Sequence, residues 1–371
     1  MRDLNFNIED LHIPCTLLET DELINSINNI TDRKLYFLCD QELVNLPVFK
    51  KIISKVINIE AIYFICATET NKTLNTISEI SEFFIEKGID RKSLLLVIGG
   101  GTVGNIGGMV ASLLFRGIDF IHIPTTFLAM SDSVFSLKQA VNTKFGKNQL
   151  GLFAVSQKIL INYEFIDKQD KVVVDGLYEL VKNILIISPE YYADLKDALT
   201  SKVFDRDKFY LMLEMCRYSK EKVMSTDKFE KNRALVLEYG HTIGHAIETF
   251  SKGEISHGNA VGIGMRIAAE VSYELGFLSE DIKDKHNDLI NSIGNLEHTF
   301  SNEDIDSIVD IMKNDNKKGY LNTKSDTIDL VLIENLGRPL FTDNIPLFPV
   351  RINLIRKVLT KLLLVKKGKY D

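Results

Sequence analysis

Four short runs in the first half of the chain are rich in β-branched and other apolar residues, and they constrain the fold more than any other feature. They are KLYFLCD (34–40), AIYFICAT (61–68), SLLLVIGG (93–100) and DFIHIPTT (119–126). Each ends in polar or glycine residues, as buried parallel strands do. The segment LNTISEISEFFIEKG (74–88) between two of them has a helical pattern and ends on a glycine. Strands that alternate with helices predict a doubly wound α/β domain.

The second half of the chain has a different character from about Tyr163 onward. Its segments are long and amphipathic, as in KFYLMLEMCRYSKEKVM (208–224) and GNAVGIGMRIAAEVSYELG (258–276). A chain of 371 residues is long enough for two domains. We therefore expect an α/β domain over residues 1–165 and a mostly helical domain over residues 166–371.

Charge and composition exclude several classes of function. The net charge is -7 and the pI is about 5.6, whereas nucleic-acid binding calls for a basic surface. No apolar run approaches the roughly 18 residues that span a membrane, and the N-terminus lacks a signal-peptide pattern. The four cysteines show no CxxC spacing. We expect a cytoplasmic protein with reduced thiols that binds a small molecule, with no nucleic-acid or membrane partner.

A glycine-rich segment, VIGGGTVGNIGG (97–108), directly follows one predicted strand and contains Gly99, Gly101 and Gly104 in GxGxxG spacing. Such glycines let the backbone approach a pyrophosphate at a helix N-terminus, although a tight strand-to-helix turn needs the same residues. No acidic residue clearly ends the next strand, where a dinucleotide-binding fingerprint has one. Asp40 ends an earlier strand, so the adenosine end of a dinucleotide would be held there.

The segment at residues 124–151 is denser in polar groups than a core segment. Its polar residues stand among small and apolar neighbours: Thr125, Thr126, Asp132, Lys138, Asn142, Lys147 and Asn148. A solvated loop is one interpretation. The apolar residues around them favour a second interpretation, in which the segment lines a cavity and the lysines face an anion.

Two of the chain's 7 histidines, His241 and His245, stand one helical turn apart in LEYGHTIGHAIE (237–248), and His257 follows soon after. Two polar residues on an ordinary helix would give the same spacing, and the glutamate of HExxH proteases is missing. With a third ligand from elsewhere, either Glu179 or His257, the pair would form an open catalytic site. Glu179 itself precedes Lys182 by three residues, which favours an exposed helix pair.

Taken together, these motifs resemble one family. The segments GGGTVGNIGG, RGIDFIHIPTT, DSVFSLKQAVN, GKNQLG, ELVK, EYGHTIGHAIE, SHGNAV and DNKK occur in the order found in the sugar-phosphate cyclases, the family of 3-dehydroquinate synthase. The resemblance covers about residues 69–318. It implies an N-terminal NAD-binding domain, a helical metal-binding domain, and an active site in the cleft between them.

The resemblance also implies roles for individual residues. The metal, Zn²⁺ or Co²⁺, would be bound by Glu179, His241 and His257, with His245 beside the site on substrate or leaving phosphate. NAD would be held by Asp40, Glu69, Lys72, Gly99, Gly100, Gly101, Thr125, Thr126, Asp132 and Lys147. Catalytic groups would be Lys138, Lys182, Glu230 and His245, and we add Glu238 as a candidate catalytic group of our own. Substrate would meet Arg116, Asp132, Asn148, Lys220 and Lys317. Arg116 matches an arginine that crosses a dimer interface, which implies a homodimer; an accessory subunit is a further partner to consider.

Two departures bear on the substrate. Ala234 and Glu238 stand where 3-dehydroquinate synthases have an arginine and an asparagine, and that arginine serves the substrate carboxylate. Arg233 is one residue away, which on a helix turns its side chain by about 100°. A substrate without a carboxylate would not need the missing arginine.

The combination SLKQAVN, ELVKN, LEYGHTIGH and NDNKKGY is similar to that of the 2-deoxy-scyllo-inosose synthases, although Asn259 and the N-terminal third depart from it. Those enzymes make the carbocycle of 2-deoxystreptamine antibiotics from glucose 6-phosphate. The implied reaction is transient oxidation by NAD at C4, phosphate elimination, re-reduction and intramolecular aldol closure, with Glu238 tuning proton transfer near C5. The alternatives are 3-dehydroquinate synthase, a metal-dependent polyol dehydrogenase and a catalytically silent scaffold subunit.

Overall fold

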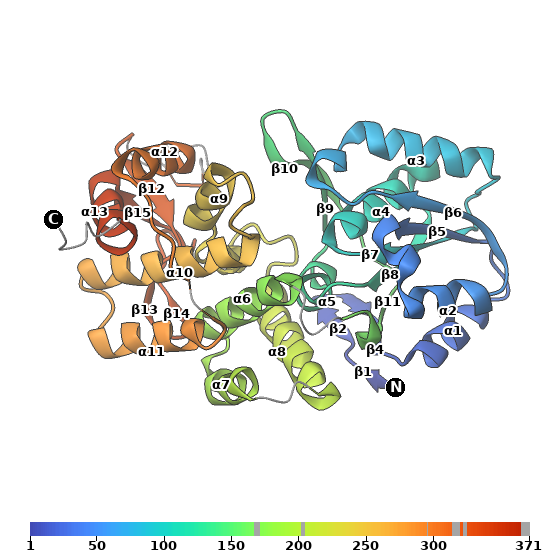
Figure 1. Ribbon diagram of the computed structural model, residues 1–371, viewed down its shortest axis with the longest axis horizontal. Coiled ribbons are helices and arrows are strands. Elements are labelled where there is room, and N and C mark those ends of the chain that lie inside the picture. The colour runs from blue at the N-terminus through green and yellow to red at the C-terminus, as the bar shows by residue number, and fades with distance from the viewer. Residues whose placement is uncertain (167–170, 202–204, 295, 314–319, 322–324, 365–371) are drawn as a thin grey trace. The chain divides into compact units, whose positions relative to one another are not determined.

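The computed structural model describes residues 1–166, 171–201, 205–294, 296–313, 320–321 and 325–364 (Figure 1). The chain divides into two compact units. The first is Met1–Val173 with Asp205–Arg217, and the second is Val174–Phe204 with Tyr218–Asp371. The division after residue 165 that we expect from the sequence stays a prediction; residues 205–217 fall with the first unit although they follow that division.

The first unit contains a seven-stranded sheet with the strand order β1-β4-β11-β8-β7-β5-β6. The strands are β1 (Arg2–Asp3), β4 (Cys15–Leu17), β5 (Leu35–Asp40), β6 (Ile59–Ile65), β7 (Leu94–Gly99), β8 (Asp119–Pro124) and β11 (Lys158–Ile161). Every neighbouring pair is parallel except β1 with β4. The four predicted strands are therefore confirmed as β5, β6, β7 and β8.

Helices cover both faces of this sheet, with α3 and α4 on one face and α1 and α2 on the other (Figure 1). Their bounds are α1 (Thr20–Asn28), α2 (Pro47–Lys55), α3 (Leu74–Glu86) and α4 (Gly101–Leu113). Because both faces are covered, all of β7 is buried, which explains its unbroken apolar run. The doubly wound α/β class predicted from the sequence is confirmed.

The strand order changes direction at β5. From β5 the chain goes to β6 at one side and then to β7 at the other, with Cys39 in register with Ile98. The carboxyl ends of these two parallel strands, Asp40 and Gly99, therefore lie at the same edge of the sheet. Ligands of open α/β sheets bind at such a switch point.

Two hairpins complete the first unit. One joins β2 (Phe6–Ile8) to β3 (Leu11–Ile13), and the other joins β9 (Lys138–Thr143) to β10 (Gly146–Phe153). The short helix α5 (Phe127–Ser131) precedes the second hairpin. Much of the polar segment at residues 124–151 is thus an antiparallel hairpin. Neither of the two interpretations from the sequence, a solvated loop or a cavity lining, included this hairpin.

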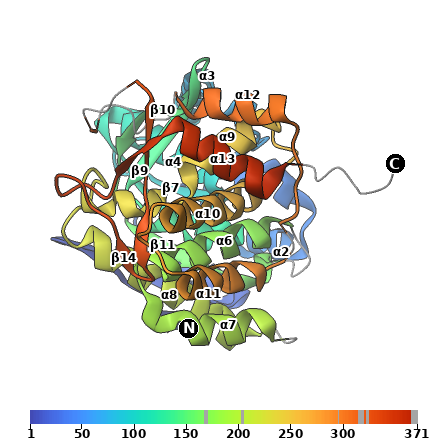
Figure 2. The ribbon, with the colours of Figure 1, turned by 90° about the vertical axis from the view of Figure 1, so that its left-hand side faces the viewer.

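The second unit is mostly helical, as predicted. Its helices are α6 (Lys171–Ile186) from Val174 on, α7 (Tyr192–Thr200), α8 (Arg206–Met224) from Tyr218 on, α9 (His241–Phe250), α10 (His257–Glu274), α11 (Glu280–Asn291), α12 (Asn302–Met312) and α13 (Ile352–Leu363). Helix α10 packs against α9, α11 and α13, and Figure 2 shows it near the centre of the unit. None of the helices within the described residues is both long and apolar enough to cross a membrane.

The second unit also contains two strand pairs that the sequence did not predict. β12 (Thr327–Leu330) pairs with β15 (Phe348–Arg351), and β13 (Ile333–Asn335) pairs with β14 (Arg338–Pro339). Each strand has at most four residues. Runs this short carry too few periods of alternation to be recognised.

Candidate metal centre and cofactor turn

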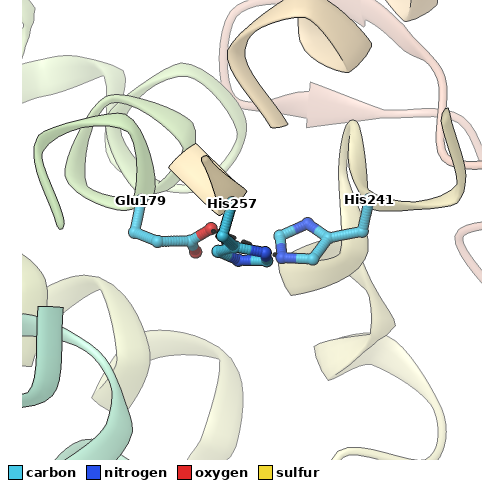
Figure 3. A group of neighbouring side chains, drawn as sticks. All are labelled: Glu179, His241 and His257. Atoms are coloured by element: carbon cyan, nitrogen blue, oxygen red, sulfur yellow. Dashed lines mark ion pairs between the residues drawn. The ribbon is translucent and has the colours of Figure 1, made fainter. Parts of the chain in front are cut away.

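Three side chains from three helices of the second unit meet at one carboxylate oxygen (Figure 3). Glu179 Oε1 on α6 lies 3.4 Å from His241 Nε2 on α9 and 3.6 Å from His257 Nε2 on α10. One ligand atom from each residue falls within 4.8 Å of the others. Glu179 Oε1 is buried and makes no hydrogen bond within the described structure. A buried oxygen faced by two imidazole nitrogens fits a divalent ion such as Zn²⁺ or Co²⁺.

Two glycines explain why α9 and α10 come close enough to bring the histidines together. Gly240 precedes His241 and has a φ of +78°, a conformation that favours glycine. A Cβ atom on Gly264 would lie 2.1 Å from the Gly240 carbonyl oxygen. The two backbones therefore touch at the turn where α9 begins.

Each histidine is held through its other ring nitrogen. His241 Nδ1 donates to the Tyr239 carbonyl oxygen at 3.2 Å, and His257 Nδ1 donates to Glu248 Oε2 at 3.2 Å. With a metal ion bound, each Nε2 would offer its lone pair to the ion on the side of the ring that faces Glu179. Metal-binding histidines are generally oriented in this way.

The pair of Glu179 and Lys182 is buried, so the interpretation as an exposed helix pair is wrong. Lys182 Nζ donates to Glu179 Oε2, and the two side chains are only 3% and 2% exposed. Burial would raise the pKa of Glu179, but the charge of Lys182 and the two imidazoles hold that pKa well below its usual range. Burial would lower the pKa of His257, but Glu179 and Glu248 raise it to about 10. The centre is thus built around a carboxylate that stays ionised.

The structure places His245 beside the three candidate ligands. Its ring centroid lies 5.1 Å from that of His241 and 5.8 Å from that of His257. The group of three ligand atoms does not include it. This position agrees with a role on substrate, which stays a prediction.

Four other residues of the second unit were predicted to bind substrate or to take part in catalysis: Lys220, Glu230, Glu238 and Lys317. Lys220 on α8 and Glu230 are buried, while Glu238 is partly buried at the end of the 3₁₀ helix Arg233–Glu238. Lys317 lies outside the described residues. Ala234 is 1% exposed, and its amide donates to Asp227 Oδ2 at 3.0 Å.

In the first unit, the glycine turn joins β7 to α4 as predicted, with Gly100 as the residue that caps the helix. A small hollow that opens to solvent is lined by Gly99, Gly100, Gly101, Gly104, His122 and Ser133, among others. Thr125 N donates to the Gly99 carbonyl at 3.1 Å, and a Cβ on Gly100 would lie 3.2 Å from Thr126. The turn and both threonines therefore meet at the N-terminus of a 13-residue helix, where an anion is favoured.

A second group of predicted residues forms a hydrogen-bonded network near this turn. Lys72 Nζ donates to Asn148 Oδ1 at 2.6 Å, and Asn142 Nδ2 donates to Glu69 Oε2 at 2.8 Å. The backbone N–H of Asn148 donates to Asn142 Oδ1 at 2.9 Å. Thr102 on α4 donates to Glu69 Oε1 at 3.4 Å, which links the network to the glycine turn. Burial lowers the pKa of Lys72.

The remaining predicted residues of the first unit include Lys147, whose charge also lowers the pKa of Lys72 in this network. Asp40 accepts a hydrogen bond from Glu42 N at 3.1 Å, and burial raises the pKa of Asp40. Asp132 is partly buried after α5. Lys138 and Lys147 are exposed on the hairpin. Arg116 is exposed at a φ of +70°.

Three residues with positions near these sites were not identified from the sequence. His122 faces the hollow, and burial lowers its pKa to about 4. Glu248 accepts a hydrogen bond from His257, and Asp175 on α6 contacts the start of α10. The sequence spacing could have indicated two of them. Glu248 stands seven residues after His241 and Asp175 four residues before Glu179, so each shares a helix face with a predicted ligand.

Comparisons with known proteins show which family the chain resembles. Family models of the 3-dehydroquinate synthase N-terminal and C-terminal domains match residues 62–175 and 176–318. A 2-deoxy-scyllo-inosose synthase from Micromonospora echinospora is 39% identical over 298 residues, or 80% of this chain and 75% of that protein. One from Niallia circulans is 38% identical over 293 residues, or 78% of this chain and 80% of that protein.

A solved structure agrees over nearly the whole chain. It is a crystal structure of 2-deoxy-scyllo-inosose synthase complexed with carbaglucose-6-phosphate, NAD⁺ and Co²⁺. The TM-score is 0.86 at 30% identity, over 98% of this chain and 100% of that one. With both family models matched in order, this chain belongs to the 3-dehydroquinate synthase family, the sugar-phosphate cyclases that its motifs resemble.

Proposed function

We propose that this protein converts glucose 6-phosphate to 2-deoxy-scyllo-inosose with release of phosphate, using NAD and a divalent metal, Zn²⁺ or Co²⁺. The observation that carries the proposal is the convergence of Glu179, His241 and His257 in a chain 38–39% identical to two 2-deoxy-scyllo-inosose synthases. A related enzyme of 30% identity binds carbaglucose-6-phosphate, NAD⁺ and Co²⁺.

The surroundings of Ala234 support a substrate without a carboxylate. Ala234 is buried and cannot offer a cation. The neighbouring Arg233 is exposed, and its guanidinium carbon lies 6.0 Å from the centre of the Phe341 ring. Glu238, close by, adds a negative charge that a carboxylate substrate would meet unfavourably. Glucose 6-phosphate fits these residues better than a heptulosonate phosphate does.

The chain's own groups would perform the following work. Glu179, His241 and His257 would hold the metal, which when bound polarises the oxygen of the carbon being oxidised. The glycine turn and Thr126 would hold the NAD pyrophosphate, and NAD supplies the reversible oxidation at C4.

The charged side chains would act beside these two sites. Lys182 would keep Glu179 ionised. Lys138, Lys220 and His245 would bind the phosphate, and Glu238 would move a proton near C5.

A homodimer would follow if Arg116 serves a neighbouring subunit. Its exposure supports this assignment. The free cysteines, three of which are buried, support a reducing, cytoplasmic setting.

Phosphate release tests the proposal. Purified protein with NAD⁺ and Co²⁺ or Zn²⁺ is given glucose 6-phosphate or 3-deoxy-arabino-heptulosonate 7-phosphate, and phosphate and NADH are followed together. We expect phosphate and a cyclic ketone from glucose 6-phosphate with no net NADH. Release from the heptulosonate alone would assign the chain to 3-dehydroquinate synthase activity. Stoichiometric NADH without phosphate would indicate a polyol dehydrogenase.

A further inference from the structure

Helix α9 presents three polar groups on one side. His241 begins the helix, His245 follows one turn later, and Glu248 is seven residues, or two turns, after His241. The reaction proposed above gives roles to the two histidines and none to the glutamate. Glu248 is nevertheless largely buried, with 14% of its side chain exposed.

The contact of Glu248 lies on the far side of the His257 ring from the candidate metal position. Glu248 Oε2 accepts from His257 Nδ1 at 3.2 Å, while Nε2 of the same ring lies 3.6 Å from Glu179 Oε1. A proton held on Nδ1 leaves the Nε2 lone pair free for a metal ion. An anionic partner also makes the imidazole a stronger donor than a neutral partner does.

The backbone that carries His257 is fixed from a second direction. Asp175 stands four residues, or one turn, before Glu179 on α6. Asp175 Oδ1 accepts from Ser256 Oγ at 2.6 Å and from Gly258 N at 2.9 Å, the residues on either side of His257. A Cβ on Gly258 would lie 2.3 Å from Asp175 Cα, so the two helices touch here. The helix that supplies Glu179 thus also sets the position of His257.

The two histidines differ in how they are oriented. His241 donates to the backbone carbonyl of Tyr239, which no side-chain substitution removes. His257 depends on the carboxylate of Glu248 for its ring and on Asp175 for its backbone. His257 is also the more exposed of the two, at 29% of its side chain against 10% for His241. A ring with more space around it needs a partner to hold one orientation.

We propose that Glu248 is a positioning residue of the metal centre, which fixes the tautomer and the ring orientation of His257, and that Asp175 fixes the backbone of the same ligand. The inference rests on the proposed metal centre. It gives the last residue of the EYGHTIGHAIE motif a physical role distinct from those of the two histidines in it.

Metal affinity tests the inference without any assay of turnover. Metal-free protein is titrated with Zn²⁺ against a chromophoric chelator, for the unaltered chain and for Glu248→Gln and Glu248→Ala. We expect Glu248→Ala to weaken Zn²⁺ binding about 10- to 100-fold, as removal of such partners does. Glu248→Gln keeps an oxygen that can accept from Nδ1, and should lose less. The visible spectrum of the Co²⁺ form should change in Glu248→Ala.

Glu254→Ala is the matched control. Glu254 is exposed in the loop between α9 and α10, and its replacement removes the same charge as Glu248→Ala does. Its affinity should equal that of the unaltered chain. Thermal unfolding of the metal-free variants shows whether each is folded, and Asp175→Asn, which retains an acceptor oxygen, provides a milder second variant.

Equal affinities for Glu248→Ala and Glu254→Ala in folded proteins would overturn the inference. If the unaltered chain bound no Zn²⁺, the centre and the inference would both fail. If it bound Zn²⁺ but left glucose 6-phosphate unchanged, only the proposed reaction would fail.

Discussion

Lys182 donates a hydrogen bond to Glu179 one turn earlier on α6, and almost nothing of either side chain is exposed. The ammonium group neutralises a carboxylate that burial alone would protonate. It also leaves the second carboxylate oxygen, Oε1, directed at the two histidines. The pair therefore belongs to the candidate metal centre, and removal of the cation would leave a buried carboxylate uncompensated.

Replacement of Lys182 should destabilise the metal-free protein. In Lys182→Met the carboxylate of Glu179 stays buried without its cation, and breaking a buried pair in this way costs about 3 kcal/mol or more. Bound Zn²⁺ should recover part of this loss, because the ion replaces the missing positive charge. Urea unfolding of the metal-free and Zn²⁺-bound protein measures both quantities.

The chain offers a matched control for that substitution. Lys313 and Asp310 form a pair of the same spacing at 2.6 Å, but their side chains are 47% and 70% exposed. Lys313→Met should change the free energy of unfolding by less than about 1 kcal/mol. Equal effects of the two substitutions would show that burial of Glu179 and Lys182 has no energetic consequence.

The three histidines should separate into two classes. His241→Asn and His257→Asn should each abolish stoichiometric Zn²⁺ binding and the thermal stabilisation that goes with it. For the unaltered chain that stabilisation is about 2.7 kcal/mol when free Zn²⁺ is 100 times its Kd. His245→Asn should keep both, since its ring stands beside the three ligand atoms, and should lose phosphate release. Loss of bound Zn²⁺ in His245→Asn would make His245 a ligand.

Much of the fold follows from the sequence, and less of the site does. The strands β5 and β7 carry long apolar runs because helices cover both faces of the sheet. The Glu179–Lys182 pair was misassigned because i,i+3 spacing does not reveal which side of a helix is buried. Here Tyr178, Leu180 and Val181 are all buried as well, so α6 is enclosed all round. In a helix that is buried on every side, the expectation that polar residues face solvent does not predict where Glu179 and Lys182 lie.

The histidines show the same limit. A four-residue spacing places His241 and His245 on one helix face, and it cannot decide which of them binds metal. The outcome depends on where α6 and α10 bring Glu179 and His257, and that is fixed by contacts distant in sequence, such as Gly240 against Gly264. Family resemblance supplied the ligand set that spacing alone left open.

The contact of Gly240 with Gly264 leads to a prediction of its own. Gly264→Ala would place a methyl group 2.1 Å from the Gly240 carbonyl oxygen, so α9 must move away from α10. We expect a loss of about 1–3 kcal/mol in the free energy of unfolding, together with weaker Zn²⁺ binding because His241 moves with α9. Gly294→Ala is the control, since a methyl group there meets open space. Calorimetry and chelator competition on both variants test this, and unchanged Zn²⁺ affinity in Gly264→Ala would contradict it.

Asp329 on β12 should make the protein less stable as pH rises. It is 7% exposed, its Oδ1 has no hydrogen-bond partner within the described residues, and burial raises its pKa to about 6. The folded state therefore holds a proton that the unfolded chain releases near its ordinary pKa of 3.8, so stability is lost between about pH 4 and pH 6 and stays low above that range. Asp329→Asn removes this effect and should stabilise the protein by on the order of 1 kcal/mol at pH 7.5, with little gain at pH 4, in urea unfolding at the two pH values. The exposed Asp326→Asn is the control, and a gain at pH 4 as large as at pH 7.5 would show that ionisation of Asp329 is not the cause.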